Sequence, residues 1–77
     1  INLAEDFLER MGLSQVRLRH YGHLCRIEVL PKEFPVFLSR RPQIIEKLKK
    51  LGYHYVTLDL EGYRSGSMNE ILRRKKP

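Results

Sequence analysis

Apolar positions at the start of the chain recur every three to four residues, which is the period of a helix. Residues 2–12 therefore predict a short helix, with Asn2 suited to cap its start and Gly12 suited to end it. Its buried stripe would consist of Leu3, Phe7, Leu8 and Met11.

The period changes to two in residues 15–30, where apolar and polar positions alternate on both sides of a turn. This pattern predicts a β-hairpin. Both apolar sets face one side only if the turn has an even number of residues, and Tyr21-Gly22 and Gly22-His23 both satisfy this condition. One face would carry Val16, Leu18, Cys25, Ile27 and Val29. The opposite face, which we call the polar face, would carry Arg17, Arg19, Arg26 and Glu28.

Two helical segments are predicted after the hairpin. Residues 31–39 predict a short helical turn whose inward side chains would be Phe34, Phe37 and Leu38. Residues 41–51 predict a longer helix that begins near Pro42 and ends before Gly52. The buried stripe of this helix would consist of Ile44, Ile45, Leu48 and Leu51.

A third strand is predicted over residues 53–60, with Val56, Leu58 and Leu60 on its apolar face. A hairpin, a helical crossover and a third strand together predict an α+β domain. We expect a small three-stranded sheet packed by helices on one face. If the second and third strands are parallel, the crossover should be right-handed.

A polar loop, residues 61–67, follows the third strand and contains two glycines, an arginine and two serines. Ser67 and Glu70 have the spacing of a capping box, which predicts that a helix starts there. Free backbone N–H groups and the positive end of a helix favour an anion at such a place. The alternative interpretation is an ordinary capped connection.

The net charge of the chain indicates which class of ligand it would bind. The chain has 77 residues, which corresponds to a single domain, and its net charge is +6 from 15 basic and 9 acidic residues. Such an excess attracts nucleic acid, nucleotides or phosphorylated metabolites. The arginines of the polar face would form a patch suited to phosphate or carboxylate. The alternative is a solvent-exposed face with one Arg–Glu pair.

Other features of the sequence exclude several classes of protein. A single cysteine cannot form an internal disulfide, and no apolar run approaches the roughly 20 residues of a membrane span. We therefore expect a cytoplasmic protein with no membrane partner. Because the sequence begins with Ile1, we also expect it to be a piece of a longer chain.

Candidate metal ligands and nucleophiles are few. His20, His23 and Cys25 lack a fourth zinc ligand, so turn histidines and a core cysteine are the favoured interpretation. Asp59 and Glu61 are secondary candidates for a metal ion such as Mg²⁺, since they would share a face if the strand continued. No nucleophile–base set and no Walker-type phosphate loop is present. The residues alone indicate a binding or regulatory domain.

Three runs of sequence resemble a known family. They are residues 58–70 (LDLEGYRSGSMNE), residues 16–21 with 26–29 (VRLRHY and RIEV), and residues 48–53 (LKKLGY). In these runs the chain resembles the C-terminal end of the ATP-dependent sacrificial sulfur transferases of the PP-loop (pyrophosphatase-loop) superfamily. Enzymes of that family make the nickel-pincer nucleotide cofactor of lactate racemase.

The resemblance implies a division of labour between two domains. In the family, an N-terminal PP-loop ATPase domain binds ATP through a Ser-Gly-Gly-x-Asp-Ser loop and adenylates a pyridinium carboxylate nucleotide, and a cysteine then gives up its sulfur. This chain lacks that loop. The resemblance thus implies that residues 1–77 are the C-terminal accessory domain of a longer, homo-oligomeric enzyme that uses ATP and Mg²⁺. The isolated chain is expected to be inactive and to bind no cofactor.

The resemblance also suggests roles for single residues. Arg17, Arg19 and Glu28 match the family's hairpin motif and would contact phosphate or a substrate carboxylate. The terminal motif adds further candidates for anion binding or for contact with the ATPase domain, namely Arg64, Ser65 and Ser67. Cys25 stands where the family has a small, alanine-like residue, and the sulfur donor is expected in the N-terminal domain.

A second functional hypothesis comes from another class. A small basic module could bind single-stranded nucleic acid, with Tyr53 and Tyr55 as stacking platforms beside the arginines. Such a module should bind oligonucleotides with an affinity that falls steeply as salt rises. The sulfur-transferase hypothesis expects weak or no binding of oligonucleotides by this chain.

Overall fold

Three helices, a 3₁₀ turn and three strands make up the computed structural model, which describes residues 3–64. In chain order they are α1 (Leu3–Arg10), β1 (Val16–Tyr21), β2 (Leu24–Val29), the 3₁₀ turn η1 (Pro31–Glu33), α2 (Phe34–Ser39), α3 (Arg41–Lys50) and β3 (Tyr55–Leu58). The described residues contain no helix that is long and apolar enough to cross a membrane.

The hairpin has the predicted faces and the second of the two predicted turns. β1 and β2 pair antiparallel from Val16↔Val29 to Tyr21↔Leu24, which leaves Gly22-His23 as the turn. The φ angle of Gly22 is +62°, whereas that of His23 is not positive, as in a type II′ turn. This turn suits the twist of a two-stranded ribbon, and glycine adopts its first position without strain.

The sheet has the order β1-β2-β3, with β2 and β3 parallel. The connection between the parallel strands contains η1, α2 and α3, as the pattern predicted. Gly52 ends α3 with a φ of +111°. The Gly52 N–H donates to the Lys49 carbonyl and the Tyr53 N–H to the Leu48 carbonyl, which is a Schellman motif.

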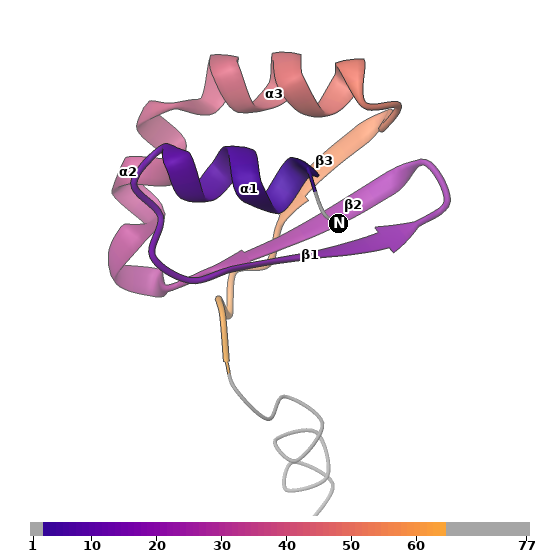
Figure 1. The fold of residues 1–77 in the computed structure, drawn as a ribbon. Coiled ribbons are helices and arrows are strands. Elements are labelled where there is room, and N and C mark those ends of the chain that lie inside the picture. The colour runs from indigo at the N-terminus through magenta and orange to yellow at the C-terminus, as the bar shows by residue number, and fades with distance from the viewer. Residues whose placement is uncertain (1–2, 65–77) are drawn as a thin grey trace, which may run out of the picture.

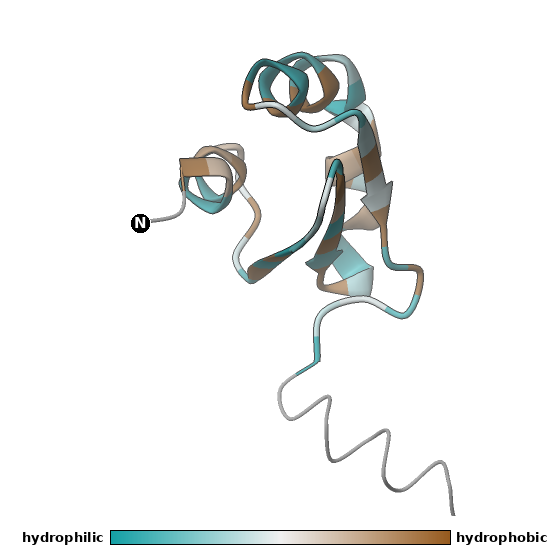
Figure 2. Cartoon of the chain, turned by 90° about the vertical axis from the view of Figure 1, so that its right-hand side faces the viewer, coloured by the Kyte–Doolittle hydropathy of each residue, from teal (hydrophilic) through white to brown (hydrophobic). Residues whose placement is uncertain are grey.

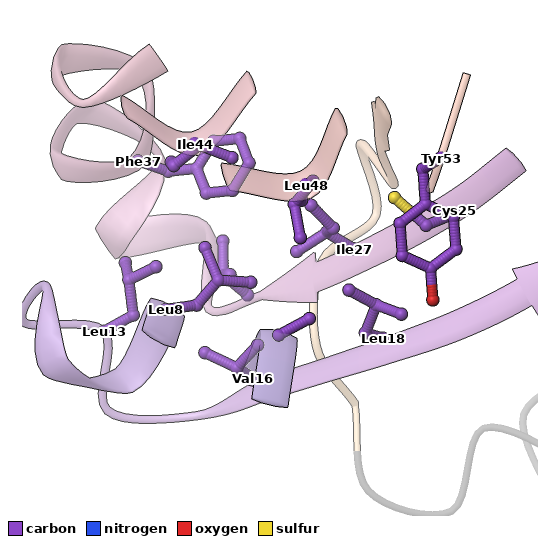
Figure 3. Close-up of a cluster of buried hydrophobic side chains, with 12 residues drawn as sticks. Leu8, Leu13, Val16, Leu18, Cys25, Ile27, Phe37, Ile44, Leu48 and Tyr53 are labelled. Carbon is purple, nitrogen blue, oxygen red and sulfur yellow. The ribbon is translucent and has the colours of Figure 1, made fainter. Parts of the chain in front are cut away.

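The hydrophobic core lies between the sheet and one layer of helices. Figure 1 shows α1 and α3 on the same side of the sheet, and Figure 2 shows both helices nearly end-on above the strands. The core side chains in Figure 3 come from α1, α2, α3 and the two hairpin strands, with Leu13 and Tyr53 from the connections after α1 and α3. The predicted apolar face of the hairpin is fully buried, comprising Val16, Leu18, Cys25, Ile27 and Val29. The α+β prediction is thus confirmed.

Four predicted core residues are instead exposed: Leu3, Leu38, Leu51 and Leu60. Leu3 and Leu51 lie at helix termini, beyond the part of each helix that faces the sheet. Leu38 lies on α2, where Phe37 takes the buried position. Leu60 is 80% exposed because β3 ends at Leu58, two residues earlier than predicted.

The chain crosses to the other side of the sheet after β3. Residues 59–64, here called the crossing segment, run back under the sheet on the side away from the helices (Figures 1 and 2). The Tyr63 N–H donates to the Val29 carbonyl over 2.7 Å, which attaches the segment to the end of β2. The polar face is therefore partly covered by its own chain.

Candidate anion-binding site

The polar face brings together the arginines of both hairpin strands. Strand register places Arg17 opposite Glu28 and Arg19 opposite Arg26, all on the face that the helices do not cover. β2 is the central strand, so Arg26 also has a neighbour on β3, Thr57. The three arginines are half-buried, whereas Glu28 is only 2% exposed.

Arg26 is the arginine that the carboxylates of this face neutralise. Its Nη2 donates to Glu28 Oε2 over 3.0 Å, and its Nε lies 3.7 Å from Asp59 Oδ2. The Tyr21 ring lies against the guanidinium, whose central carbon is 5.5 Å from the ring centroid. Arg26 thus serves to keep two carboxylates in place, and Glu28 is buried as its partner.

Arg17 and Arg19 have no such partner. Within residues 3–64, no carboxylate oxygen lies within 4.0 Å of a guanidinium nitrogen of Arg17 or Arg19, whereas Arg26 has two such contacts. The Nε atoms of Arg19 and Arg26 are both buried without a hydrogen-bond partner among the same residues, so this feature does not distinguish the two. The missing carboxylate partner does, and it makes Arg17 and Arg19 the candidate place for an external anion.

The crossing segment contributes an aromatic ring to this site. The guanidinium of Arg17 lies over the ring of Tyr63, with its central carbon 5.3 Å from the ring centroid. Arg17 is on β1 and Tyr63 follows β3, so only the folded chain brings them together. Tyr63 was absent from the candidate residues predicted from the sequence. Its position in the LDLEGYRSGS run was the available signal.

The backbone of the crossing segment is closely fitted to the end of β2. Asp59 accepts a hydrogen bond from the Glu61 N–H over 2.9 Å, and the Gly62 N–H donates to the Asp59 carbonyl. Gly62 has a φ of +84°, and a Cβ atom there would lie 2.8 Å from Pro31 Cγ and 2.9 Å from the Val29 carbonyl oxygen. Only glycine fits this position without displacement.

The terminal motif is described in part. Arg64, predicted to bind an anion, forms an ion pair with Glu61, so its charge is already matched within the segment. The other two predicted residues, Ser65 and Ser67, lie outside the described residues, as does the capping box with Glu70. The proposed anion site at the loop therefore rests on sequence alone, whereas the arginine pair of the hairpin has a described geometry.

The carboxylates proposed for a metal ion both follow the end of β3, and each has a different partner. The side chain of Asp59 faces Arg26 and the Glu61 N–H, and that of Glu61 pairs with Arg64. The part of the chain that the structure describes contains no group of three His, Cys, Asp or Glu side chains that could hold a metal ion.

The histidines and the cysteine of the hairpin have different surroundings. His20 Nδ1 bonds to the Tyr53 hydroxyl, and the His23 ring stacks on His54 at a centroid distance of 4.4 Å. Cys25 is fully buried on the core face. Burial raises the pKa of its thiol, more than the hydrogen bonds of the backbone lower it. A thiol in this environment is a poor nucleophile.

One of the two tyrosines in the nucleic-acid hypothesis is not available for stacking. Tyr53 is 9% exposed, and its hydroxyl is held by His20 on the core side of the sheet. Burial raises its pKa, and the nearby Cys25 adds to this effect. Tyr55 is 65% exposed, so a single tyrosine of the predicted pair remains at the surface. Stacking of successive bases needs more than one such platform.

An apolar hollow is lined by other residues than those of the polar face. It has a volume of about 170 Å³ and runs between α2, α3 and the outer edge of β3. Its lining is mostly aliphatic and aromatic, with Arg41 at its rim. It offers contact area for another surface and no group that could act on a substrate.

Comparison with known proteins gives three relatives, although no family model matches the chain. The chain is 39% identical over 71 residues to the pyridinium-3,5-bisthiocarboxylic acid mononucleotide synthase of Lactiplantibacillus plantarum, which covers 92% of this chain and 26% of that protein. It is 38% identical over 76 residues to an uncharacterized protein of Synechocystis sp., covering 96% of this chain and 28% of that protein.

A third relative is an uncharacterized protein of Methanocaldococcus jannaschii, 32% identical over 65 residues, which covers 84% of this chain and 25% of that protein. The chain thus spans about a quarter of the length of the curated relatives it matches. The match to the synthase confirms the family resemblance that the three sequence runs indicated.

Proposed function

We propose that this chain is the C-terminal accessory domain of an ATP-dependent sulfur transferase of the PP-loop superfamily. In this proposal an N-terminal domain of the same polypeptide binds ATP and Mg²⁺ and performs the chemistry. The present domain completes the substrate site and contributes to the oligomer. The proposal is supported by the 39% identity to a synthase of a pyridinium mononucleotide and by the coverage of only about a quarter of that protein.

The observation that carries the proposal is the unequal pairing of the three arginines. Arg26 is matched by Glu28 and Asp59, whereas Arg17 and Arg19 have no carboxylate partner in the described part of the chain. The described carboxylates therefore do not neutralise the charges of Arg17 and Arg19. Two arginines on one face of β1 without carboxylate partners are suited to bind a phosphate or a carboxylate.

The chemistry of the ligand follows from that receptor. A mononucleotide of a pyridinium carboxylic acid carries a phosphate monoester as well as carboxylate on the ring, and an arginine pair can hold either group through paired N–H donors. Binding the end of the substrate that does not react would fix its position relative to the ATPase domain. We assign this role to Arg17 and Arg19, with Glu28 as the internal anchor of Arg26.

Substitution of the two arginines in the full-length protein tests this function. Arg17→Ala and Arg19→Ala should each lower kcat/KM for sulfur transfer about tenfold or more, because each removes charge-assisted hydrogen bonds to the substrate. The matched control is Arg10→Ala, which removes an exposed arginine at the end of α1, on the opposite side of the sheet. Its kcat/KM should stay within about twofold of the wild type.

Three results would count against the proposal. Unchanged turnover in both Arg17→Ala and Arg19→Ala would reduce the patch to an ordinary surface. Sulfur transfer by the isolated 77-residue chain would contradict the assignment of the chemistry to another domain. Tight, salt-dependent binding of oligonucleotides to this chain would favour the nucleic-acid hypothesis instead.

A further inference from the structure

We propose that Tyr63 is a positioning residue that holds the guanidinium of Arg17 in the orientation in which it binds the substrate anion. This inference rests on the proposed function and adds a residue to its site. The evidence is the contact itself, the way in which the crossing segment is attached, and the difference between the partners of Arg17 and Arg26.

The contact is a guanidinium over an aromatic face. Arg17 lies 5.3 Å from the centroid of the Tyr63 ring, within the range of cation–π attraction. An unrestrained arginine side chain has many rotamers and loses that freedom when it binds an anion. A guanidinium stacked on a ring has already lost part of this rotamer freedom before the anion binds. The N–H groups of the stacked guanidinium still point outward in the guanidinium plane, where they can reach a phosphate or a carboxylate.

The crossing segment is built so that the ring stays in this place. The Tyr63 N–H bond to the Val29 carbonyl fixes the backbone of the residue at 2.7 Å. Gly62 lets the chain approach Pro31 and Val29 more closely than any side chain would allow. This close approach brings the ring to the start of β1, where Arg17 lies.

An aromatic partner differs from an acidic one in a way that matters for binding. Arg26 is held by Glu28 and Asp59, and those carboxylates neutralise its charge. Tyr63 orients Arg17 without adding a negative charge, so the attraction for an anion is preserved. Arg26 thus supports the structure of the site, whereas Arg17 is oriented to bind an anion.

The test measures the affinity of the full-length protein for nicotinic acid mononucleotide, a pyridinium nucleotide with one carboxylate and one phosphate, by isothermal titration calorimetry. Tyr63→Phe keeps the aromatic face and should change Kd by less than about twofold. Tyr63→Leu keeps an apolar side chain but removes that face, and should raise Kd about fivefold.

A double-mutant cycle separates positioning from a general effect on structure. If Tyr63 acts through Arg17, then Tyr63→Leu in an Arg17→Ala background should change Kd by less than about twofold. Tyr21→Leu is the matched control, because it removes the same kind of ring from Arg26, which is already held by carboxylates. It should leave Kd within about twofold of the wild type. Thermal unfolding of each variant shows whether the fold is kept.

The outcomes distinguish this inference from the function on which it rests. Loss of affinity in Arg17→Ala with no loss in Tyr63→Leu would overturn the role of Tyr63 and leave the anion site in place. No loss in Arg17→Ala would overturn the anion site itself. Equal losses in Tyr63→Leu and Tyr21→Leu, or an undiminished loss in the Arg17→Ala background, would also overturn the positioning role.

Discussion

The arginines of the polar face differ in their partners although their spacing is alike. Arg17, Arg19 and Arg26 all alternate with apolar positions on two paired strands. Their partners separate them: Arg26 has two carboxylates, Arg17 has an aromatic ring, and Arg19 has no carboxylate partner in the described residues. The role of an arginine here is decided by what lies next to it.

Gly62 is the residue of the crossing segment that should tolerate substitution least. Gly62→Ala places a Cβ atom against Pro31 and the Val29 carbonyl, in addition to the strain of a positive φ. We expect the free energy of unfolding to fall by more than the ~1 kcal/mol that positive φ alone costs a non-glycine residue. Urea unfolding of the 77-residue chain measures this change.

Gly12→Ala is the control for that experiment. Gly12 also has a positive φ, of +102°, but a Cβ atom there would meet nothing within 4 Å. It should therefore show the conformational strain without the collision. If the two variants lose the same stability, the crossing segment is not held closely against Pro31.

At the scale of elements, α1 protects the open edge of the sheet as well as covering the core. β1 is an edge strand, and its Leu18 N–H donates to the Glu5 carboxylate of α1 over 2.8 Å. Unpaired N–H groups of an edge strand otherwise attract other strands. The hairpin beneath the arginines is thereby fixed to a helix at its outer strand.

Replacement of Glu5 tests this attachment. Glu5→Ala removes an acceptor from a half-buried N–H, so the free energy of unfolding should fall by about 1–2 kcal/mol. The amide of Leu18 should exchange its hydrogen with solvent faster, as measured by NMR. Glu9→Ala on the exposed side of the same helix is the matched control and should change stability by less than about 0.5 kcal/mol. Unchanged exchange at Leu18 in Glu5→Ala would show that the bond contributes nothing.

At the scale of the whole molecule, the core contains two groups that ionise only at alkaline pH. Cys25 and Tyr53 come from β2 and from the turn after α3, and burial raises the pKa of both above their ordinary values of 9.0 and 10.0. A raised pKa in the folded state means that folding favours the neutral form. The stabilisation is complete below the unfolded pKa values and is lost as pH rises through the folded ones.

We therefore expect the free energy of unfolding to decrease as pH rises above about 9, and the decrease should be smaller in Cys25→Ala. Urea unfolding at several pH values between about 7 and 10 measures both curves. The difference between the curves reports on Cys25, together with the part of the raised pKa of Tyr53 that Cys25 causes. If the two curves are parallel, ionisation of the Cys25 thiol does not lower the free energy of unfolding.

Most of the architecture was predictable because each element carries its own periodic pattern. Parity alone gave the shared apolar face of the hairpin and left two possible turns, of which the structure has Gly22-His23, and proline and glycine marked the ends of α3. The errors fell where a pattern continued past its element. Leu60 continues the apolar alternation of β3 in the sequence, but the strand ends at Leu58. The Asp59 side chain then accepts a hydrogen bond from the Glu61 N–H, which forms a turn around Leu60. A local hydrogen bond of this kind is not visible in hydrophobic periodicity.

The candidate site was predictable only in its composition. Alternation placed Arg17, Arg19, Arg26 and Glu28 on one face, but it could not show that Glu28 is buried beneath Arg26. It also gave no reason to relate Tyr63 to Arg17. These facts depend on where residues 59–64 pass, and that path is set by contacts with Pro31 and Val29, which are distant in sequence.

The sequence by itself determined which side chains share a face, because strand and helix periods act over a few residues and require no partner. It also determined the family resemblance, through the run that ends in the terminal motif. Only the tertiary structure decided which arginines have carboxylate partners. Charge neutralisation needs groups within a few ångströms of one another, and Arg26 meets Asp59 of the crossing segment only when β2 and β3 lie side by side.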